Sequence, residues 1–84
     1  MRLAATDFGL TRQTIIEQDS DGTLALLIDR KSRIIMADGR KIIDKIIKIR
    51  EKLPGVSIVI KTSAPVCSKT NALLEKQQIR IESL

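Results

Sequence analysis

GTLALLIDRKSR, residues 22–33, is the stretch that decides the expected fold. Its first half, Leu24 to Ile28, is continuously apolar rather than alternating, which is typical of a central strand covered on both faces. The charged triplet Asp29-Arg30-Lys31 follows directly. If it continues the strand, a period of two places the side chains of Asp29 and Lys31 on the same side of the sheet.

The residues before this strand predict a β-hairpin. Arg12 to Gln18 and Thr23 to Asp29 are rich in Ile, Leu and Thr, and they flank Asp19-Ser20-Asp21-Gly22, whose Asp, Ser and Gly favour a turn. Nearer the N-terminus, Arg2 to Thr6 is compatible with an edge strand and Phe8-Gly9 with a turn.

The residues after the strand predict a helix, a strand, a helix and a strand. Asp38 is expected to cap a helix from Gly39 to Leu53, because isoleucines recur at helical spacing and Pro54-Gly55 ends the pattern. The remaining expected elements are a buried strand Val56–Lys61, a short helix capped by Ser68 and packed through Ala72, Leu73 and Leu74, and a closing strand Ile79–Glu82. Helical crossovers require at least one parallel pair, so the predicted fold class is α/β with a small mixed sheet.

Composition narrows the function. The 84 residues are enough for a single domain, 1–84, and the net charge of +5 favours an anionic partner, nucleic acid first. The basic residues we expect to contact nucleic acid are Arg30, Arg33, Arg40, Lys41, Lys45 and Lys48. Ordinary solubility charge is the alternative. A single aromatic residue argues against a base-stacking platform for single strands.

The cysteine and histidine counts exclude several kinds of site. One cysteine and no histidine rule out zinc sites built on those residues and rule out Ser-His-Asp or Cys-His catalysis. A lone cysteine cannot form an intramolecular disulfide, and no apolar run approaches the ~20 residues of a membrane span, so a cytoplasmic location is expected. Any metal must be a hard ion held by oxygen ligands, such as Mg²⁺.

Two short segments are candidates for chemistry. Asp29 can ligate Mg²⁺, and Lys31 can help to deprotonate a metal-side water or stabilise phosphorane charge; the alternative is a surface ion pair. Cys67-Ser68-Lys69-Thr70 resembles a phosphate loop at a strand-to-helix junction, but without the glycines of a Walker motif a capped helix start is favoured. With no histidine to activate it, Cys67 is expected to be a buried structural thiol.

The stretch from Thr14 to Leu84 resembles the core of the PD-(D/E)XK nuclease superfamily, which includes archaeal Holliday junction resolvases and many restriction enzymes. Asp29-Arg30-Lys31 matches the (D/E)-x-K motif, and the order of elements matches that of the restriction-endonuclease-like core. The resemblance implies Asp29 and Lys31 as catalytic residues, Mg²⁺ as cofactor and DNA, rather than RNA, as partner.

Two departures from the family pattern bear on activity. Gln13-Thr14 stands where the family's Pro-Asp is expected, and residues 1–13 offer no counterpart of its leading helix, although Asp7 lies there. Glu17 is the first candidate for a substitute metal ligand, with Asp19 and Asp21 as alternatives, and a second chain is another source.

We therefore expect a nuclease-like domain, a homodimer, that binds nucleic acid or a protein partner without full catalytic competence. An active Mg²⁺-dependent DNA endonuclease and a structural oligomerisation module are the alternatives.

Overall fold

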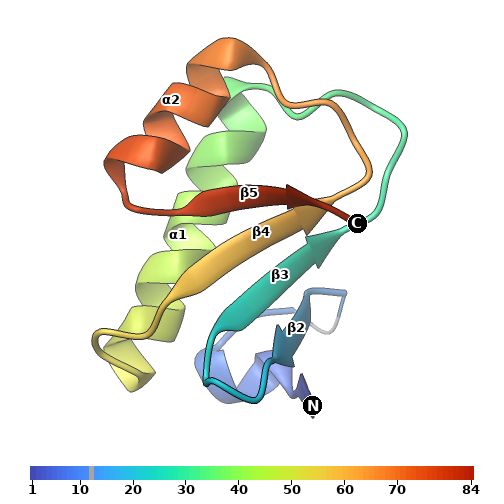
Figure 1. Ribbon diagram of the computed structural model, residues 1–84. Coiled ribbons are helices and arrows are strands. Elements are labelled where there is room, and N and C mark those ends of the chain that lie inside the picture. The colour runs from blue at the N-terminus through green and yellow to red at the C-terminus, as the bar shows by residue number, and fades with distance from the viewer. Residues whose placement is uncertain (12) are drawn as a thin grey trace.

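The computed structural model describes residues 1–11 and 13–84 and shows one five-stranded sheet with two α-helices (Figure 1). The elements are β1 (Arg2–Leu3), η1, a 3₁₀ turn (Ala5–Phe8), β2 (Ile15–Gln18), β3 (Leu24–Ile28), α1 (Met36–Lys52), β4 (Ile58–Thr62), α2 (Ser68–Lys76) and β5 (Arg80–Ser83). The mixed α/β fold predicted from the sequence is confirmed.

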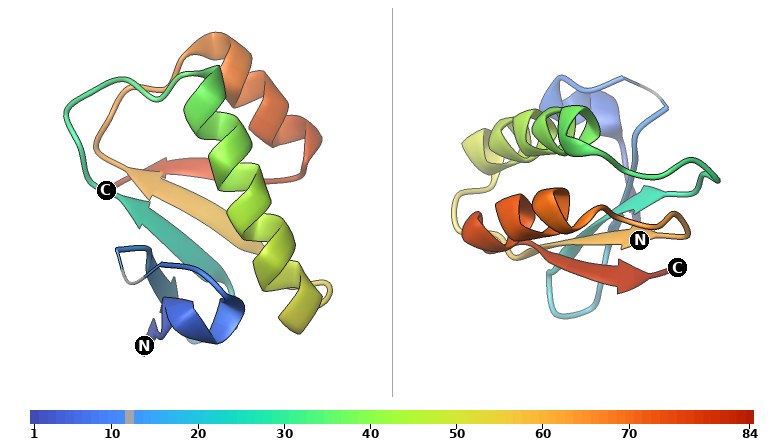
Figure 2. Two further views of the ribbon diagram at one scale, coloured as in Figure 1. Left: turned by 180° about the vertical axis from the view of Figure 1, so that it is seen from behind. Right: turned by 90° about the horizontal axis from the view of Figure 1, so that it is seen from above.

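The strands lie in the sheet in their chain order, β1-β2-β3-β4-β5. β1, β2 and β3 pair antiparallel, whereas β4 is parallel to β3 and to β5. Each parallel connection contains one helix, and both helices cover the same face of the sheet (Figure 2). The carboxyl ends of the three parallel strands therefore meet at one end of the sheet.

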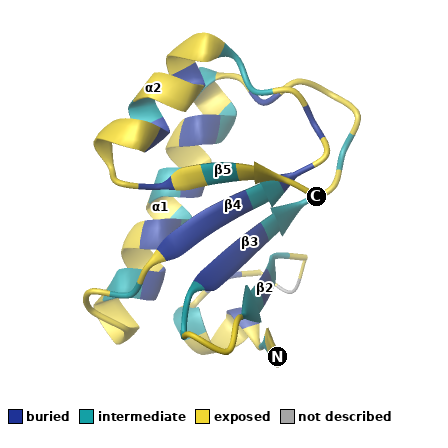
Figure 3. Cartoon of the chain, in the orientation of Figure 1, coloured by how far each residue is buried: buried dark blue, intermediate teal, exposed yellow. Residues whose placement is uncertain are grey.

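The core lies between this face and the helices. Its central strands contribute Leu24, Leu26, Ile58 and Ile60, and α1 contributes Ile42, Ile46 and Ile49. On the opposite face Ala25 and Val59 are also buried, as Figure 3 shows for the middle of β3 and β4. Residues on both faces of β3 are thus buried at the middle of the strand, which agrees with the continuous apolar run that predicted a central strand, although both helices lie on one face.

Several predicted boundaries are wrong by a few residues. The hairpin's first strand begins at Ile15, and the predicted start, Arg12, lies outside the described residues. Residues 2–6 do not form one strand: β1 ends at Leu3, and η1 follows until Gly9, whose φ of 74° turns the chain. The predicted turn at Asp19–Gly22 is present, with the Gly22 amide 3.0 Å from the Asp19 carbonyl.

The largest correction concerns the start of α1. The helix begins at Met36, so Asp38 is its third residue and not its cap. The Asp38 carboxylate reaches back and accepts a hydrogen bond of 3.0 Å from the amide of Ile35, the residue that does stand at the cap.

Within the described residues, no helix is long and apolar enough to cross a lipid bilayer.

Candidate nucleic-acid interface

The Asp29-Arg30-Lys31 triplet lies just beyond the end of β3 and not on the strand itself. β3 ends at Ile28, and the triplet opens the loop that leads to α1. Asp29 and Lys31 are both exposed. The strand-period argument that placed their side chains on one side of a sheet is therefore wrong, because neither residue has strand pairing.

Ser63 holds Asp29 from the neighbouring strand. It follows β4, and because β3 and β4 are parallel their carboxyl ends lie side by side. The Ser63 hydroxyl donates to Oδ1 of Asp29 at 2.6 Å, and Oγ of Ser63 accepts a hydrogen bond of 3.2 Å from the amide of Arg30. The sequence interpretation missed Ser63; its signal was a hydroxyl directly after a buried parallel strand.

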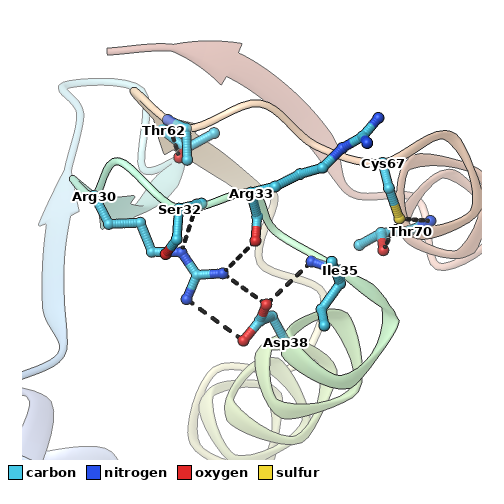
Figure 4. A network of polar contacts seen from close by, with 9 residues as sticks. Arg30, Ser32, Arg33, Ile35, Asp38, Thr62, Cys67 and Thr70 are labelled. Atoms are coloured by element: carbon cyan, nitrogen blue, oxygen red, sulfur yellow. Dashed lines mark hydrogen bonds and ion pairs between the residues drawn. The ribbon is translucent and has the colours of Figure 1, made fainter.

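Arg30 ties the loop to α1 (Figure 4). Its guanidinium donates to both carboxylate oxygens of Asp38, at 2.6 and 3.4 Å, and to the carbonyls of Ser32 and Arg33, at 3.1 and 2.8 Å. This pairing, helped by the Ile35 amide, lowers the pKa of the Asp38 carboxyl. Arg30 was predicted to contact nucleic acid, but its guanidinium N–H groups donate hydrogen bonds within the loop and to α1.

A cleft of about 460 Å³ opens next to Asp29, between the ends of β2 and β3 and the side of α1. One wall carries Gln13 and Thr14, and another carries Lys45 of α1. Ile15 pairs with Leu27, so continuing the antiparallel register by one residue puts Thr14 opposite Ile28. The position expected for the family's aspartate therefore lies across from the residue before Asp29 and lines the same cleft, and it holds a hydroxyl instead of a carboxylate.

Glu17 does not reach this cleft. It pairs with Ala25, four residues before Asp29, which corresponds to roughly 13 Å along the strand. Its carboxylate instead makes an ion pair of 3.3 Å with Arg2 on β1. The prediction that Glu17 and Asp29 share a metal ion is therefore wrong for this arrangement.

The oxygen ligands near Asp29 do not make a Mg²⁺ site of the expected composition. Among residues 1–11 and 13–84, no three Cys, Asp or Glu side chains come together in a way that could hold a metal ion. A site with Asp29 needs a further carboxylate from outside this group, since Mg²⁺ is bound through carboxylates together with water and phosphate.

Lysines at helical spacing line one flank of α1. We call Lys41, Lys45 and Lys48 the lysine stripe, because residues four and three apart follow one side of a helix. Lys45 borders the Asp29 cleft and also two smaller hollows of about 240 and 250 Å³, which Lys41 shares; Lys48 borders one of them. The stripe therefore runs along a continuous series of depressions in the surface.

The other predicted basic contacts lie elsewhere. Arg40 is five residues before Lys45, which places it about 140° around the helix from that residue. Arg33 extends toward Cys67 at the start of α2 (Figure 4) and helps to lower the pKa of that thiol. The predicted surface is thus split: the lysine stripe gathers at the cleft with Asp29, whereas Arg33 and Arg40 do not.

The segment Cys67-Ser68-Lys69-Thr70 is a capped helix start. The cap is Cys67 and not Ser68 as predicted: its Sγ accepts from the Thr70 amide at 3.4 Å and lies 2.8 Å from the Thr70 hydroxyl. These two contacts with Thr70 lower the pKa of the Cys67 thiol, with smaller contributions from Lys69 and Arg33. Cys67 is partly exposed, so the expectation of a buried thiol is wrong.

Known structures share this fold. A chain of EndoMS in complex with double-stranded DNA matches with a TM-score of 0.69 and 22% identity over 83% of this chain and 29% of that one. EndoMS in its apo form gives 0.67 and 22%, over 83% and 33%. A repair endonuclease from Pyrococcus abyssi gives 0.68 and 15%, over 83% and 31%.

No protein-family model and no curated protein sequence matches the chain. The chain spans about a third of the length of each structure that it resembles. At these identities the similarity establishes the fold alone: the chain has the restriction-endonuclease-like α/β architecture that the sequence predicted.

Proposed function

We propose that this chain is a nuclease-like domain that binds double-stranded DNA along the lysine stripe and does not cut it by itself. The fold supports the proposal, since EndoMS, one of the structures that share it, is described in complex with double-stranded DNA. The net charge of +5 has the sign that a phosphate backbone requires.

The observation that carries the proposal is the position of the lysine stripe beside the cleft. Lys41 to Lys48 span about 10 Å of helix at 1.5 Å per residue. Duplex DNA carries one charge per about 1.7 Å of its axis, so a stripe of this length faces several phosphates at once. Hollows of about 460 and 250 Å³ adjoin the stripe and offer space for a backbone beside α1.

The arrangement around Asp29 supports binding without cleavage. Thr14 occupies the place where a second carboxylate is expected, and Glu17 is roughly 13 Å away along the strand. Asp29 itself is engaged by the Ser63 hydroxyl. A lone carboxylate leaves Mg²⁺ weakly bound and a nucleophilic water poorly positioned.

A Mg²⁺-dependent DNA endonuclease is the second candidate. Asp29 and Lys31 are both exposed at the end of β3, where a carboxylate from another chain has access to them. In this version Asp29 would ligate the metal, Lys31 would help to deprotonate the attacking water, and a partner would supply the missing carboxylate.

One experiment separates the two candidates. Duplex, single-stranded and branched DNA are each incubated with the protein, with Mg²⁺, with Mn²⁺ and with a chelator, while binding and cleavage are both measured. Binding that persists in chelator with no cleavage supports the proposal. Cleavage that needs metal and is lost in Asp29→Ala establishes the second candidate instead, and absence of binding to any substrate rejects both.

A further inference from the structure

The outer edge of β5 is the long open edge of the sheet. No described strand pairs with its outer side, whereas the opposite edge is formed by the two residues of β1. A hollow of about 740 Å³ lies along this edge, between β5 and α2. Unpaired strand edges bind further strands unless something blocks them.

The hydrogen bonds of β4 show which groups of β5 are free. The main-chain carbonyl of Thr62 accepts a hydrogen bond from the amide of Leu84 across the β4–β5 ladder. The main-chain amide of the next residue, Ser63, donates to the carbonyl of Ile28, on the β3 side of β4. Main-chain groups alternate in direction along a strand, so the N–H and C=O groups that point toward β4 are those of Arg80, Glu82 and Leu84. The N–H and C=O groups of Ile81 and Ser83 therefore point outward, away from the sheet.

The charges on this edge are self-complementary. Arg80 and Glu82 stand two residues apart on one face of β5, with 76% and 45% of their side chains exposed and a long contact of 3.8 Å between them. In an antiparallel pair with a two-fold axis at Ile81, Arg80 faces the partner's Glu82 and Glu82 faces the partner's Arg80. Opposite charges in such cross-strand positions are stabilising.

The neighbouring registers are unfavourable. The outward N–H and C=O groups of β5 could also pair with the two-fold axis at Arg80 or at Glu82. These registers put like charges directly opposite each other, which is destabilising. When the two-fold axis lies at Ile81, the amide of Ile81 donates to the carbonyl of the partner's Ile81. The amide of Ser83 then donates to the carbonyl of the partner's Ile79. One register thus satisfies both the hydrogen bonds and the charges.

We propose that a second copy of this chain pairs antiparallel along β5, centred on Ile81, so that the two sheets become continuous. The pairing keeps the helices of both copies on the same face, because opposed residues in an antiparallel pair share a face. It uses neither the lysine stripe nor Asp29, so it stands independently of DNA binding.

The first test is sedimentation of the whole protein over a wide range of concentration, without DNA. We expect a reversible monomer–dimer equilibrium. Arg80→Glu or Glu82→Arg alone places like charges opposite each other and weakens the dimer on the order of tenfold, and the double exchange Arg80→Glu/Glu82→Arg restores it. Ser83→Pro removes an outward N–H and weakens the dimer while leaving the pairing of β5 with β4 intact.

A second test reports the register. In a Cys67→Ser background, Ile81→Cys is expected to form a disulfide between copies on oxidation, because hydrogen-bonded antiparallel partners have Cα atoms about 5.5 Å apart. Ser83→Cys is the matched control: the two Ser83 positions lie roughly 13 Å apart, beyond a disulfide. A protein that stays monomeric up to about millimolar concentration, or a dimer unaffected by these changes, overturns the proposal.

Discussion

Arg30 and Asp38 join the loop after β3 to the first turn of α1, with Nη2 of Arg30 2.6 Å from Oδ2 of Asp38 and Nη1 3.4 Å from Oδ1. Both side chains are partly covered, with 34% and 26% exposed. The same carboxylate accepts from the Ile35 amide. One aspartate therefore sets both the helix start and the path of the loop that carries Lys31.

The lowered pKa of Asp38 predicts how this contact depends on pH. Its folded pKa lies below the ordinary value of 3.8, so its contribution to stability is complete above that value and is lost as the pH falls through the folded pKa. We expect Asp38→Asn to unfold at lower urea concentration than the native protein at neutral pH, and the difference to shrink in acid. A difference that stays constant down to about pH 2 contradicts the assignment.

At Gly39 we expect substitution by alanine to change stability in the direction opposite to that of helix propensity. A Cβ at this position lies 2.7 Å from Cγ2 of Thr70, a fully buried and branched side chain on α2. Alanine normally stabilises a helix over glycine by about 1 kcal/mol, but overpacking costs about 1–3 kcal/mol. We expect Gly39→Ala to destabilise the protein by up to about 2 kcal/mol in urea unfolding.

The matched control for Gly39 keeps the hydroxyl that contacts Cys67. Thr70→Ser removes only Cγ2, so in that background Gly39→Ala is expected to be neutral or stabilising. A rise in stability for Gly39→Ala alone would show that α1 and α2 are not packed as closely as described.

The position of Thr14 in the cleft leads us to expect that one substitution can create a metal site there. Thr14→Asp adds a carboxylate to the cleft wall beside Asp29. We expect Mn²⁺ or Mg²⁺ to raise the melting temperature of this variant by more than that of the native protein, because an ion that binds only the folded state stabilises it. The gain should disappear in Thr14→Asp/Asp29→Asn.

The control for the Thr14 experiment is Glu17→Asp, which keeps a carboxylate roughly 13 Å from Asp29 along the strand and should give no such response. If Thr14→Asp behaves like the native protein with both metals, Thr14 does not lie where the strand register puts it.

Much of the fold followed from local patterns in the sequence. The apolar run Leu24–Ile28 and the isoleucine spacing in α1 identified the central strand and the main helix, because burial imposes a period on both. The helix start was misplaced because an aspartate looks the same in sequence whether it caps a helix or reaches back from the third position. The residue at the cap, Ile35, carries no capping side chain to reveal it.

The candidate site was less accessible to sequence reasoning. Asp29 was identified, but Ser63, its hydrogen-bond partner, is 34 residues away in the chain and is brought to it only by the pairing of β3 with β4. Arg30 and Lys45 looked alike as basic residues. Both residues border the cleft beside Asp29, but the guanidinium of Arg30 is held by Asp38, which the sequence does not reveal.

The lysine stripe is the central claim, and the salt dependence of duplex DNA binding tests it most directly. The affinities of the native protein, Lys41→Ala/Lys45→Ala/Lys48→Ala and the single control Lys76→Ala, an exposed lysine on α2, are compared by fluorescence anisotropy over a series of salt concentrations. Each phosphate contact adds about 0.9 to the slope of log affinity against log salt.

We predict that the triple variant binds more weakly and has a slope smaller by up to about 3, while Lys76→Ala keeps the native slope. A triple variant with the affinity and slope of the native protein would contradict the account.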